Sequence, residues 1–233
     1  MFQMVMAMSV QGTILELDHL VVGARRLDEG VRWLEDRVGV APDAGGTHEG
    51  FGTHNALLRL GDDVYLEVLA PDPAQPRPPR PRLFGLDDEE NRRLLEGGPR
   101  LLHWVVRTRD LPAAIAALAG AAGEPTAALG IASPMRRGDL CWTLAIRADG
   151  ARPPHGLPSV IDWGRAAHPS ARLPDRGVVL ERLDVEAPTA TIAALAPLRD
   201  PRVVLTKRER SALAARLRSP VGVAVIGRER RGA

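Results

Sequence analysis

The sequence predicts an α+β protein built from repeated βαβββ modules, and two observations lead to this prediction. First, a β-rich run around His19 and the helical pattern after it recur around His103, at a constant offset of 84 residues. Second, each copy continues into further β-rich segments, and the last of these carries an acid, Glu67 in the first copy and Asp162 in the second. A repeat of this kind is one supersecondary unit that buries its apolar face against a neighbouring unit.

The opening strand and helix of each copy follow from local patterns. In the first copy, the β-rich segment 15–22 precedes four apolar residues on one helix face, spaced i, i+4, i+7 and i+11: Leu27, Val31, Leu34 and Val38. Gly39 then supplies a stop signal. In the second copy, the segment 101–106 takes the place of the strand, and the first three helix positions recur at the same offset. Asp110 is placed to cap that second helix.

The remaining strands of each copy are predicted from β-rich runs and turn signals. In the first copy, segments 52–60 and 64–69 form a hairpin, and the stretch 42–50 holds the preceding short strand. In the second copy, strands are expected at 139–146 and 159–163, with a loop between them. These assignments place the first module at residues 13–70 and the second module at residues 100–170.

Two further segments complete the domain organisation. Residues 71–99 form a connector, in which the proline-rich stretch 71–82 excludes helix and favours an extended crossing, while 87–95 is a short amphipathic helix. Residues 177–226 form a degenerate third βαβββ module that repeats the topology. Arg182 stands where the first two copies have histidine, so this module is expected to hold no metal and to extend a sheet edge or cover one end of the site.

Composition limits the cellular and functional classes. The net charge is +2, and the basic clusters 207–210 and 228–231 are interrupted by glutamate, which argues against nucleic-acid binding and favours an edge strand and a tail. No apolar run is long enough to span a membrane, and the N-terminus lacks the basic region of a secretory signal. The single cysteine, Cys141, permits no intrachain disulfide and is expected to be a small core filler. A cytoplasmic location is therefore expected.

Four motifs, taken in order, carry a resemblance to a known family. They are Leu17-Asp18-His19-Leu20-Val21-Val22, Gly52-Thr53-His54-Asn55, Tyr65-Leu66-Glu67-Val68 and His103-Trp104-Val105-Val106-Arg107. Together they resemble the bacterial glyoxalase-like domain proteins of the vicinal oxygen chelate superfamily, which includes glyoxalase I, extradiol dioxygenases and bleomycin-resistance proteins. The resemblance covers roughly residues 15–170. It implies that the modules pair into an open, cup-shaped mixed β-sheet with flanking helices.

The resemblance also implies a metal site on the concave face of the cup, with ligands at His19, Glu67, His103 and Asp162. Two imidazoles and two carboxylates suit one divalent transition metal, Fe, Mn, Ni, Co or Zn, and the sequence does not choose among them. Asp162 is one carbon shorter than the glutamate that metal enzymes of the superfamily usually carry. Two other interpretations stay open: the histidines can be buried and hydrogen-bonded, and the acids can line a polar cavity without a metal.

Other polar side chains are candidates for substrate binding. His54 and Asn55 are consecutive residues of one strand, so only one of them can face the cup. Arg137 precedes the strand that holds Trp142; its guanidinium suits a carboxylate or phosphate, and the indole suits a planar ligand. For each of these residues a surface or core role is the alternative.

Two classes of function follow. The first is a metal-dependent enzyme, of the isomerase, lyase or oxygenase type, that acts on a small oxygenated molecule with Glu67 as the catalytic base. The second is a metal-free module that binds or sequesters a small ligand, as the bleomycin-resistance proteins do. In both cases the partner is a small molecule rather than nucleic acid or a membrane, and a homodimer is open.

Overall fold

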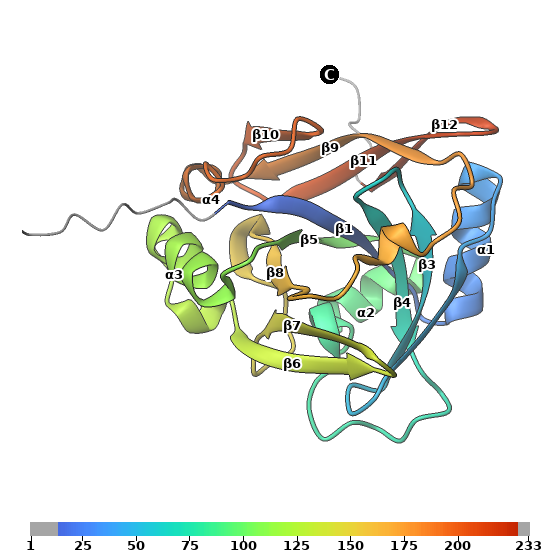
Figure 1. The fold of residues 1–233 in the computed structure, drawn as a ribbon, viewed down its shortest axis with the longest axis horizontal. Coiled ribbons are helices and arrows are strands. Elements are labelled where there is room, and N and C mark those ends of the chain that lie inside the picture. Colours follow the sequence, from blue (N-terminus) through green and yellow to red (C-terminus); the bar gives the residue numbers. More distant parts are fainter. Residues whose placement is uncertain (1–13, 228–233) are drawn as a thin grey trace, which may run out of the picture.

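The computed structural model describes residues 14–227, so the expectations for the N-terminal leader and for the basic cluster 228–231 lie outside the described residues. Two β-sheets form the core of the molecule (Figure 1). The first module consists of β1 (Glu16–Gly23), α1 (Leu27–Val38), β2 (Asp43–His48), β3 (Thr53–Arg59) and β4 (Tyr65–Pro71). The second module consists of β5 (Arg100–Arg107), α3 (Leu111–Ala122), β6 (Ile131–Arg137), β7 (Leu140–Ile146) and β8 (Ser159–Asp162).

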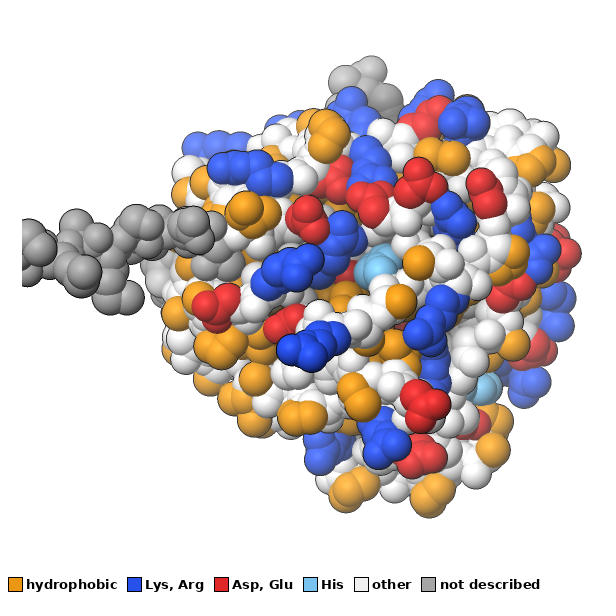
Figure 2. All heavy atoms as spheres, in the orientation of Figure 1, with side chains coloured by type: hydrophobic (Ala, Val, Ile, Leu, Met, Phe, Trp, Pro, Cys, Tyr) orange, Lys and Arg blue, Asp and Glu red, His pale blue; other side chains and the backbone are white. Residues whose placement is uncertain are grey.

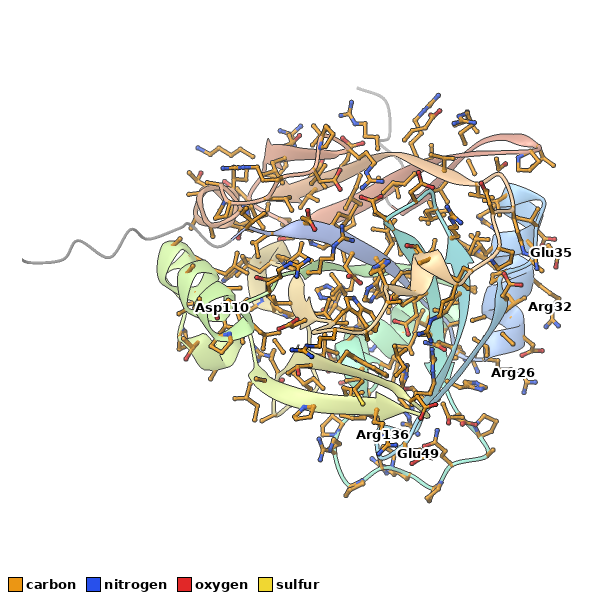
Figure 3. All side chains as sticks on the ribbon, viewed as in Figure 1. Arg26, Arg32, Glu35, Glu49, Asp110 and Arg136 are labelled. Carbon is orange, nitrogen blue, oxygen red and sulfur yellow. The ribbon has the colours of Figure 1, made fainter. Side chains whose placement is uncertain are left out.

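The helix ends have the local causes that the sequence indicated. Helix α1 ends at Gly39, whose φ of 76° lies in the left-handed region that glycine adopts without strain. Helix α3 begins after Asp110, whose carboxylate accepts a hydrogen bond of 3.0 Å from the Ala113 backbone N–H (Figure 3). Figure 3 also shows Arg26, Arg32 and Glu35 at the outer side of α1. Both predicted helices are confirmed.

Strand pairing joins the two modules into one eight-stranded sheet with the order β2-β3-β4-β1-β5-β8-β7-β6. Within each module the first strand pairs in parallel with the last, β1 with β4 and β5 with β8. The modules meet where β1 and β5 pair antiparallel. This order is symmetric about the β1–β5 junction, as a pseudo-twofold axis requires, and the sheet curls into an open cup (Figure 1). The predicted fold class is confirmed.

Each face of the curled sheet has its own apolar core. On the outer face, Leu20, Leu66 and Trp104 belong to a cluster that also includes α1, α3 and the second sheet. On the concave face, Val21 and Val105 belong to a smaller cluster that includes residues of the connector. The connector contains the short 3-10 helix η1 (Leu83–Gly85) and the helix α2 (Glu89–Glu96), and the side chains of η1 enter the cup.

The third segment has the predicted βαβββ element order, but its strands do not pair in the order of the first two modules, so the prediction that it repeats their topology is wrong. Its elements are β9 (Val179–Ala187), α4 (Thr189–Ala194), β10 (Val203–Lys207), β11 (Ala212–Ser219) and β12 (Gly222–Gly227). The sheet order is β10-β9-β11-β12, with β10, rather than the last strand, parallel to the first. The short connection through α4 returns the chain directly beside β9, which produces this order.

The second sheet buries apolar side chains against the outer face of the cup instead of extending its edge or covering its end. Five large aliphatic side chains of its strands are at most 2% exposed: Leu180, Leu183, Val185, Leu217 and Ile226. Arg182, at the position of the histidines, is paired with Asp184 within the same strand. The segment is therefore part of the main core.

The surface shown in Figure 2 carries arginine and acidic side chains that are interspersed over the viewed face. In residues 14–227, no helix has the length and apolar character needed to cross a membrane.

Candidate functional site

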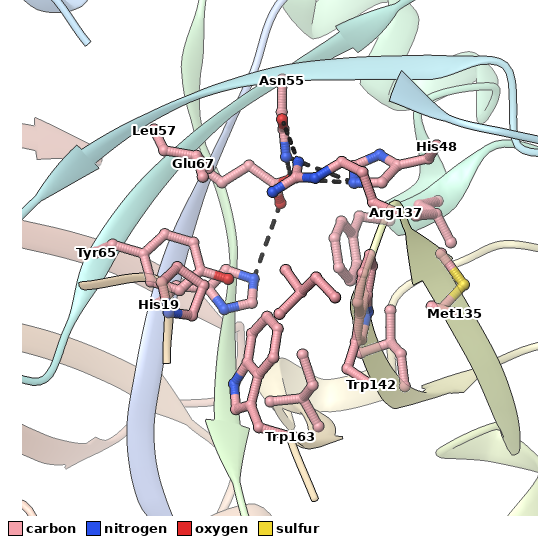
Figure 4. A pocket seen from close by; sticks show the side chains of 16 residues that line it. His19, His48, Asn55, Leu57, Tyr65, Glu67, Met135, Arg137, Trp142 and Trp163 are labelled. Carbon is pink, nitrogen blue, oxygen red and sulfur yellow. Dashed lines mark hydrogen bonds and ion pairs between the residues drawn. The ribbon is translucent and has the colours of Figure 1, made fainter. Parts of the chain in front are cut away.

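A narrow pocket opens on the concave face of the cup, between the two modules (Figure 4). Its volume is about 40 Å³, which is smaller than the roughly 300–1,000 Å³ of pockets for drug-sized ligands. Its polar residues are His19, His48, Asn55, Tyr65, Glu67 and Arg137. Its apolar wall includes Leu57, Phe84, Met135, Leu144, Ile161, Trp142 and Trp163. The pocket has room for a small reacting group or one or two water molecules.

Glu67 occupies the centre of the polar end. Strand β4 directs its side chain into the cup, where the residue is 5% exposed. One carboxylate oxygen, Oε1, accepts a hydrogen bond of 2.6 Å from Nδ2 of Asn55. The other oxygen, Oε2, lies 3.8 Å from Nε2 of His19, and Oε1 lies 3.9 Å from Nε2 of His48. The carboxylate is thus oriented by one amide and lies between two imidazoles.

A buried carboxylate holds the imidazole of His19. The pairing of β1 with β5 shifts register between Leu17 and His19, which leaves Asp18 as the extra residue of a β-bulge. The bulge lets Asp18, which is fully buried, reach Nδ1 of its neighbour His19 at 2.6 Å. A carboxylate only accepts hydrogen bonds, so Nδ1 carries the proton and Nε2 faces Glu67.

Two more donors converge on Asp18 from the segment after β8. Nε1 of Trp163 donates at 2.8 Å, and Nε2 of His168 lies at 3.1 Å. Burial by itself raises the pKa of Asp18, but the hydrogen bonds from His168 and His19 outweigh it and hold that pKa well below its usual range. The side chain is therefore an anion that orients His19.

Two aromatic rings complete the polar end. The ring of Tyr65 stacks on the His19 imidazole, with centroids 4.5 Å apart and an interplanar angle of 17°. Burial raises the pKa of the Tyr65 hydroxyl well above its usual value, so the hydroxyl keeps its proton. Burial lowers the pKa of His48, whose Nδ1 lies 3.0 Å from the Thr53 hydroxyl. His48 is therefore a neutral neighbour of Glu67.

Arg137 and Trp142 contribute to the pocket from the second module. Nη1 of Arg137 donates to Oδ1 of Asn55 over 3.4 Å, a long contact that leaves most of the guanidinium free for a ligand. The Trp142 and Trp163 rings lie 5.7 Å apart at 37°. Together with Met135, both indoles line the pocket and also an adjoining outer groove, so they flank the way in.

Five of the residues predicted for the site are brought together in this pocket: His19, Glu67, Asn55, Arg137 and Trp142. His54 is not among them. It projects from the opposite face of β3, where its Nδ1 is 3.9 Å from the Asp72 carboxylate, and it lines a different groove. Strand alternation allows only one of His54 and Asn55 to face the cup, and in the structure it is Asn55.

His103 is buried near the pocket but is not free to bind a ligand or a metal there. Its Nε2 accepts the Ser159 backbone N–H at 3.1 Å and lies 2.9 Å from the Ser159 hydroxyl. Its ring lies against Phe84, with centroids 5.2 Å apart. Burial lowers the pKa of His103 well below its usual value, so the ring is neutral. The lone pair that the metal prediction requires is already used by a backbone donor.

Asp162 points away from the pocket. Its Oδ1 accepts the Gly164 backbone N–H at 2.7 Å, and the side chain lines the outer groove. Register explains the difference. Val21 of β1 pairs with Glu67, whereas the corresponding Val105 of β5 pairs with Ser159. Ser159, rather than Asp162, thus occupies the position equivalent to Glu67.

The predicted four-residue metal site does not form, because His103 is occupied and Asp162 faces outward. Among residues 14–227, no group of three or more His, Cys, Asp or Glu side chains is arranged to hold a metal ion. The donors that do meet are His19, His48 and Glu67, with Nε2-to-carboxylate separations of 3.8 and 3.9 Å. Cys141 is exposed on β7, so its assignment to the core is wrong.

Sequence reasoning missed four residues of the site: Asp18, His48, Tyr65 and His168. Strand alternation places the neighbours of His19 on the opposite face, and only the bulge brings Asp18 to the imidazole. His48 lies in β2, a strand without the alternating apolar pattern. Tyr65 lies two residues before Glu67 on the same strand and shares its face, so strand alternation is the signal that could have found it.

Comparisons with known proteins agree with this architecture. A family model described as "Glyoxalase-like domain" matches residues 17–198. The crystal structure of a hypothetical protein from Staphylococcus aureus has a TM-score of 0.54 at 14% identity, covering 85% of this chain and 88% of that chain. No curated protein matches the sequence.

Two enzyme structures are more distant. Methylmalonyl-CoA epimerase from Mycobacterium tuberculosis has a TM-score of 0.37 at 19% identity, covering 63% of this chain and 86% of that chain. A mutant 4-hydroxymandelate synthase from Streptomyces coelicolor has a TM-score of 0.45 at 17% identity, covering 93% and 64%. The family match spans most of the chain, as the motifs around His19, Glu67 and His103 predicted, and the protein therefore belongs to the glyoxalase-like domain family.

Proposed function

We propose that the pocket is the active site of an isomerase or lyase that moves a proton on a small oxygenated substrate with an acidic group. One observation carries the proposal: Nε2 of His19 and Oε2 of Glu67 face each other across 3.8 Å in a buried pocket. An imidazole and a carboxylate, two groups that serve as general bases, are thereby directed at one point in a buried pocket.

His19 is suited to accept a proton from carbon or oxygen. Asp18 fixes the proton on Nδ1, which leaves the lone pair of Nε2 directed into the cavity. When Nε2 takes up a proton, the Asp18 anion stabilises the resulting imidazolium at 2.6 Å. The stacked ring of Tyr65 holds the imidazole plane in place.

Glu67 supplies the second proton-transfer group. Asn55 holds Oε1, so Oε2 is the oxygen available to substrate. Removing a proton next to a carbonyl places negative charge on oxygen, which needs a donor nearby. The Tyr65 hydroxyl keeps its proton, and Arg137 carries a charged donor fork that can also hold a substrate carboxylate bidentately.

The size of the cavity limits which part of the substrate is enclosed. About 40 Å³ accommodates the reacting group only. The rest of the molecule would extend past Met135, Trp142 and Trp163, which line both the pocket and the outer groove. No step of this proposal uses a metal, because His103 and Asp162 do not face the pocket together with His19 and Glu67.

The proposal is tested by hydrogen–deuterium exchange at carbon, followed by proton NMR in D₂O with a panel of small 2-oxo and 3-oxo acids. His19→Gln and Glu67→Gln are each expected to slow the exchange of a responsive acid by about 10²–10⁴-fold, the usual contribution of a general base. His54→Gln is the matched control, because this side chain projects from the other face of β3 and lines a different groove. The proposal fails if the control loses as much activity as the pocket variants, or if no acid exchanges faster than in buffer.

A non-catalytic binding module is the second candidate, and the apolar wall with its two indoles favours it. Quenching of tryptophan fluorescence measures ligand binding independently of turnover, because Trp142 and Trp163 border the cavity. For a binding module, a ligand quenches the fluorescence but shows no exchange, and His19→Gln changes the affinity only modestly.

A further inference from the structure

A second cavity, of about 800 Å³, lies outside the cup. It is bounded by α1, α2, the start of β5, the loop 151–156 and the start of β11. Its volume is within the range of pockets that hold organic ligands. His103 lies between the two cavities, because the residue lines this groove and its ring contacts Phe84, which lines the first pocket.

Three arginines line this groove, and none of them forms an ion pair with a carboxylate of residues 14–227: Arg37, Arg100 and Arg152. Arginines elsewhere in the chain are often paired, as Arg202 is with Asp200 and Asp63. The one aspartate that lines the groove is Asp88, and burial raises the pKa of its carboxyl group. The groove thus has three arginines against one lining aspartate, and so an excess of positive charge.

Arg100 is the clearest of the three. Its Nε is buried and has no hydrogen-bond partner, and its guanidinium makes no hydrogen bond or ion pair with the described residues. A buried donor without a partner is costly and rare in folded proteins. The residue is only partly buried and lines the groove, where an anion can reach the end of its guanidinium. The residue begins β5, where the strand fixes its backbone at the floor of the groove.

Arg152 is held in place but is not neutralised. Its Nη1 donates to the Leu102 carbonyl at 2.6 Å, and its Nη2 donates to Oδ1 of Asn91 at 3.0 Å. Both acceptors are neutral, so the side chain is positioned while its charge remains available. Arg37 lies over the ring of Trp33, 4.0 Å from its centroid, which adds a cation next to an apolar surface.

We propose that this groove is a second ligand site, which binds the phosphate or carboxylate group of an organic anion with Arg100 and Arg152 as its ligands. The planar guanidinium matches both groups through two parallel hydrogen bonds. Trp33 and Leu94 offer apolar contact for the remainder of the ligand. The site does not depend on the proton-transfer function, because it shares no residue with the pocket that contains His19.

Isothermal titration calorimetry with inorganic pyrophosphate and with citrate, in 150 mM NaCl, tests the site. We expect saturable binding of at least one probe below about 1 mM. Arg100→Gln should weaken it about tenfold or more, because a charge-assisted contact is lost. The guanidinium has no partner within the described residues, so this variant should fold normally, which circular dichroism checks.

Arg172→Gln is the matched control, since it removes an exposed arginine that does not line the groove. Arg152→Lys gives a second measurement: it keeps a donor for the Leu102 carbonyl and loses the planar fork, so binding should weaken again. His19→Gln should leave binding unchanged, which separates this site from the pocket. The proposal is overturned if neither anion binds saturably, or if Arg172→Gln weakens binding as much as Arg100→Gln.

Discussion

Replacing Asp18 by asparagine changes one buried oxygen into an NH₂ group and removes a negative charge. The location of the new NH₂ follows from the partners. Trp163 Nε1 only donates, so an NH₂ at Oδ2 would leave that N–H unpaired, whereas His19 can adapt by moving its own proton. We therefore expect the NH₂ to take the place of Oδ1 and to donate to Nδ1 of His19. The proton of His19 then moves to Nε2, and the lone pair that faces Glu67 is lost.

The cost in stability can be estimated from the three hydrogen bonds to Asp18, of 2.6, 2.8 and 3.1 Å. Hydrogen bonds to a charged group contribute about 1.5–3 kcal/mol and neutral ones about 0.5–1.5 kcal/mol, so three weakened bonds amount to about 3 kcal/mol. Relief from burying a charge offsets part of this. We expect Asp18→Asn to lower the free energy of unfolding by about 1–3 kcal/mol at pH 7.

The loss of unfolding free energy in Asp18→Asn should depend on pH, and its direction follows from the pKa of Asp18. The folded pKa of Asp18 is depressed, so its contribution is fully present above the unfolded value near 4 and is lost as pH falls through the folded value. The difference between wild type and variant should therefore shrink below about pH 4. Urea unfolding measures the difference, and long-range ¹H–¹⁵N NMR of the histidine rings reports the tautomer. A variant that keeps the proton on Nδ1 of His19 and full exchange activity would refute the reasoning.

Three other predictions follow from the buried histidines, the second sheet and the donor set. Burial depresses the pKa values of His103 and His48, so only the unfolded chain gains protons on these residues as the pH falls below about 6.5. The free energy of unfolding should therefore decrease below that pH, by up to about 1.4 kcal/mol per histidine per pH unit. Equal urea midpoints at pH 7.5 and 5.5 would contradict this. Deleting residues 177–233 removes five buried aliphatic side chains. At about 1.5–3 kcal/mol each, their burial contributes about 8–15 kcal/mol, which is comparable to the free energy of unfolding of a whole domain. The truncated chain should therefore be unfolded or insoluble, and a cooperative unfolding transition of a monomer would contradict this. Any transition metal that copurifies in stoichiometric amount should be lost from His19→Ala and retained by His103→Gln, because only His19 faces Glu67 in the pocket. Elemental analysis measures the metal content. Loss of the metal from both variants would instead support the prediction that both histidines are ligands.

Much of the site was accessible from local patterns. The family resemblance placed His19 and Glu67 in the cup, and strand alternation allowed only one of His54 and Asn55 to enter. Arg137 and Trp142 were proposed from their chemistry and lie in the pocket. The errors concern His103 and Asp162, where long-range pairing decides which atoms are free and which face is inward.

The sequence by itself determined the repeat, the helices of both modules, the α+β class and the family, because each depends on periodicity and motifs within a few tens of residues. Tertiary structure alone decided the bulge at Asp18, the register that puts Ser159 opposite Val105, the strand order of the second sheet and the entry of the connector into the cup. The physical reason is that register is set by pairing between distant strands, and a shift of one residue moves a side chain to the other face of the sheet. No local spacing records that shift, so the carboxylate of Asp162, expected in the pocket, lies outside it, and the carboxylate of Asp18, which was not among the predicted site residues, holds His19.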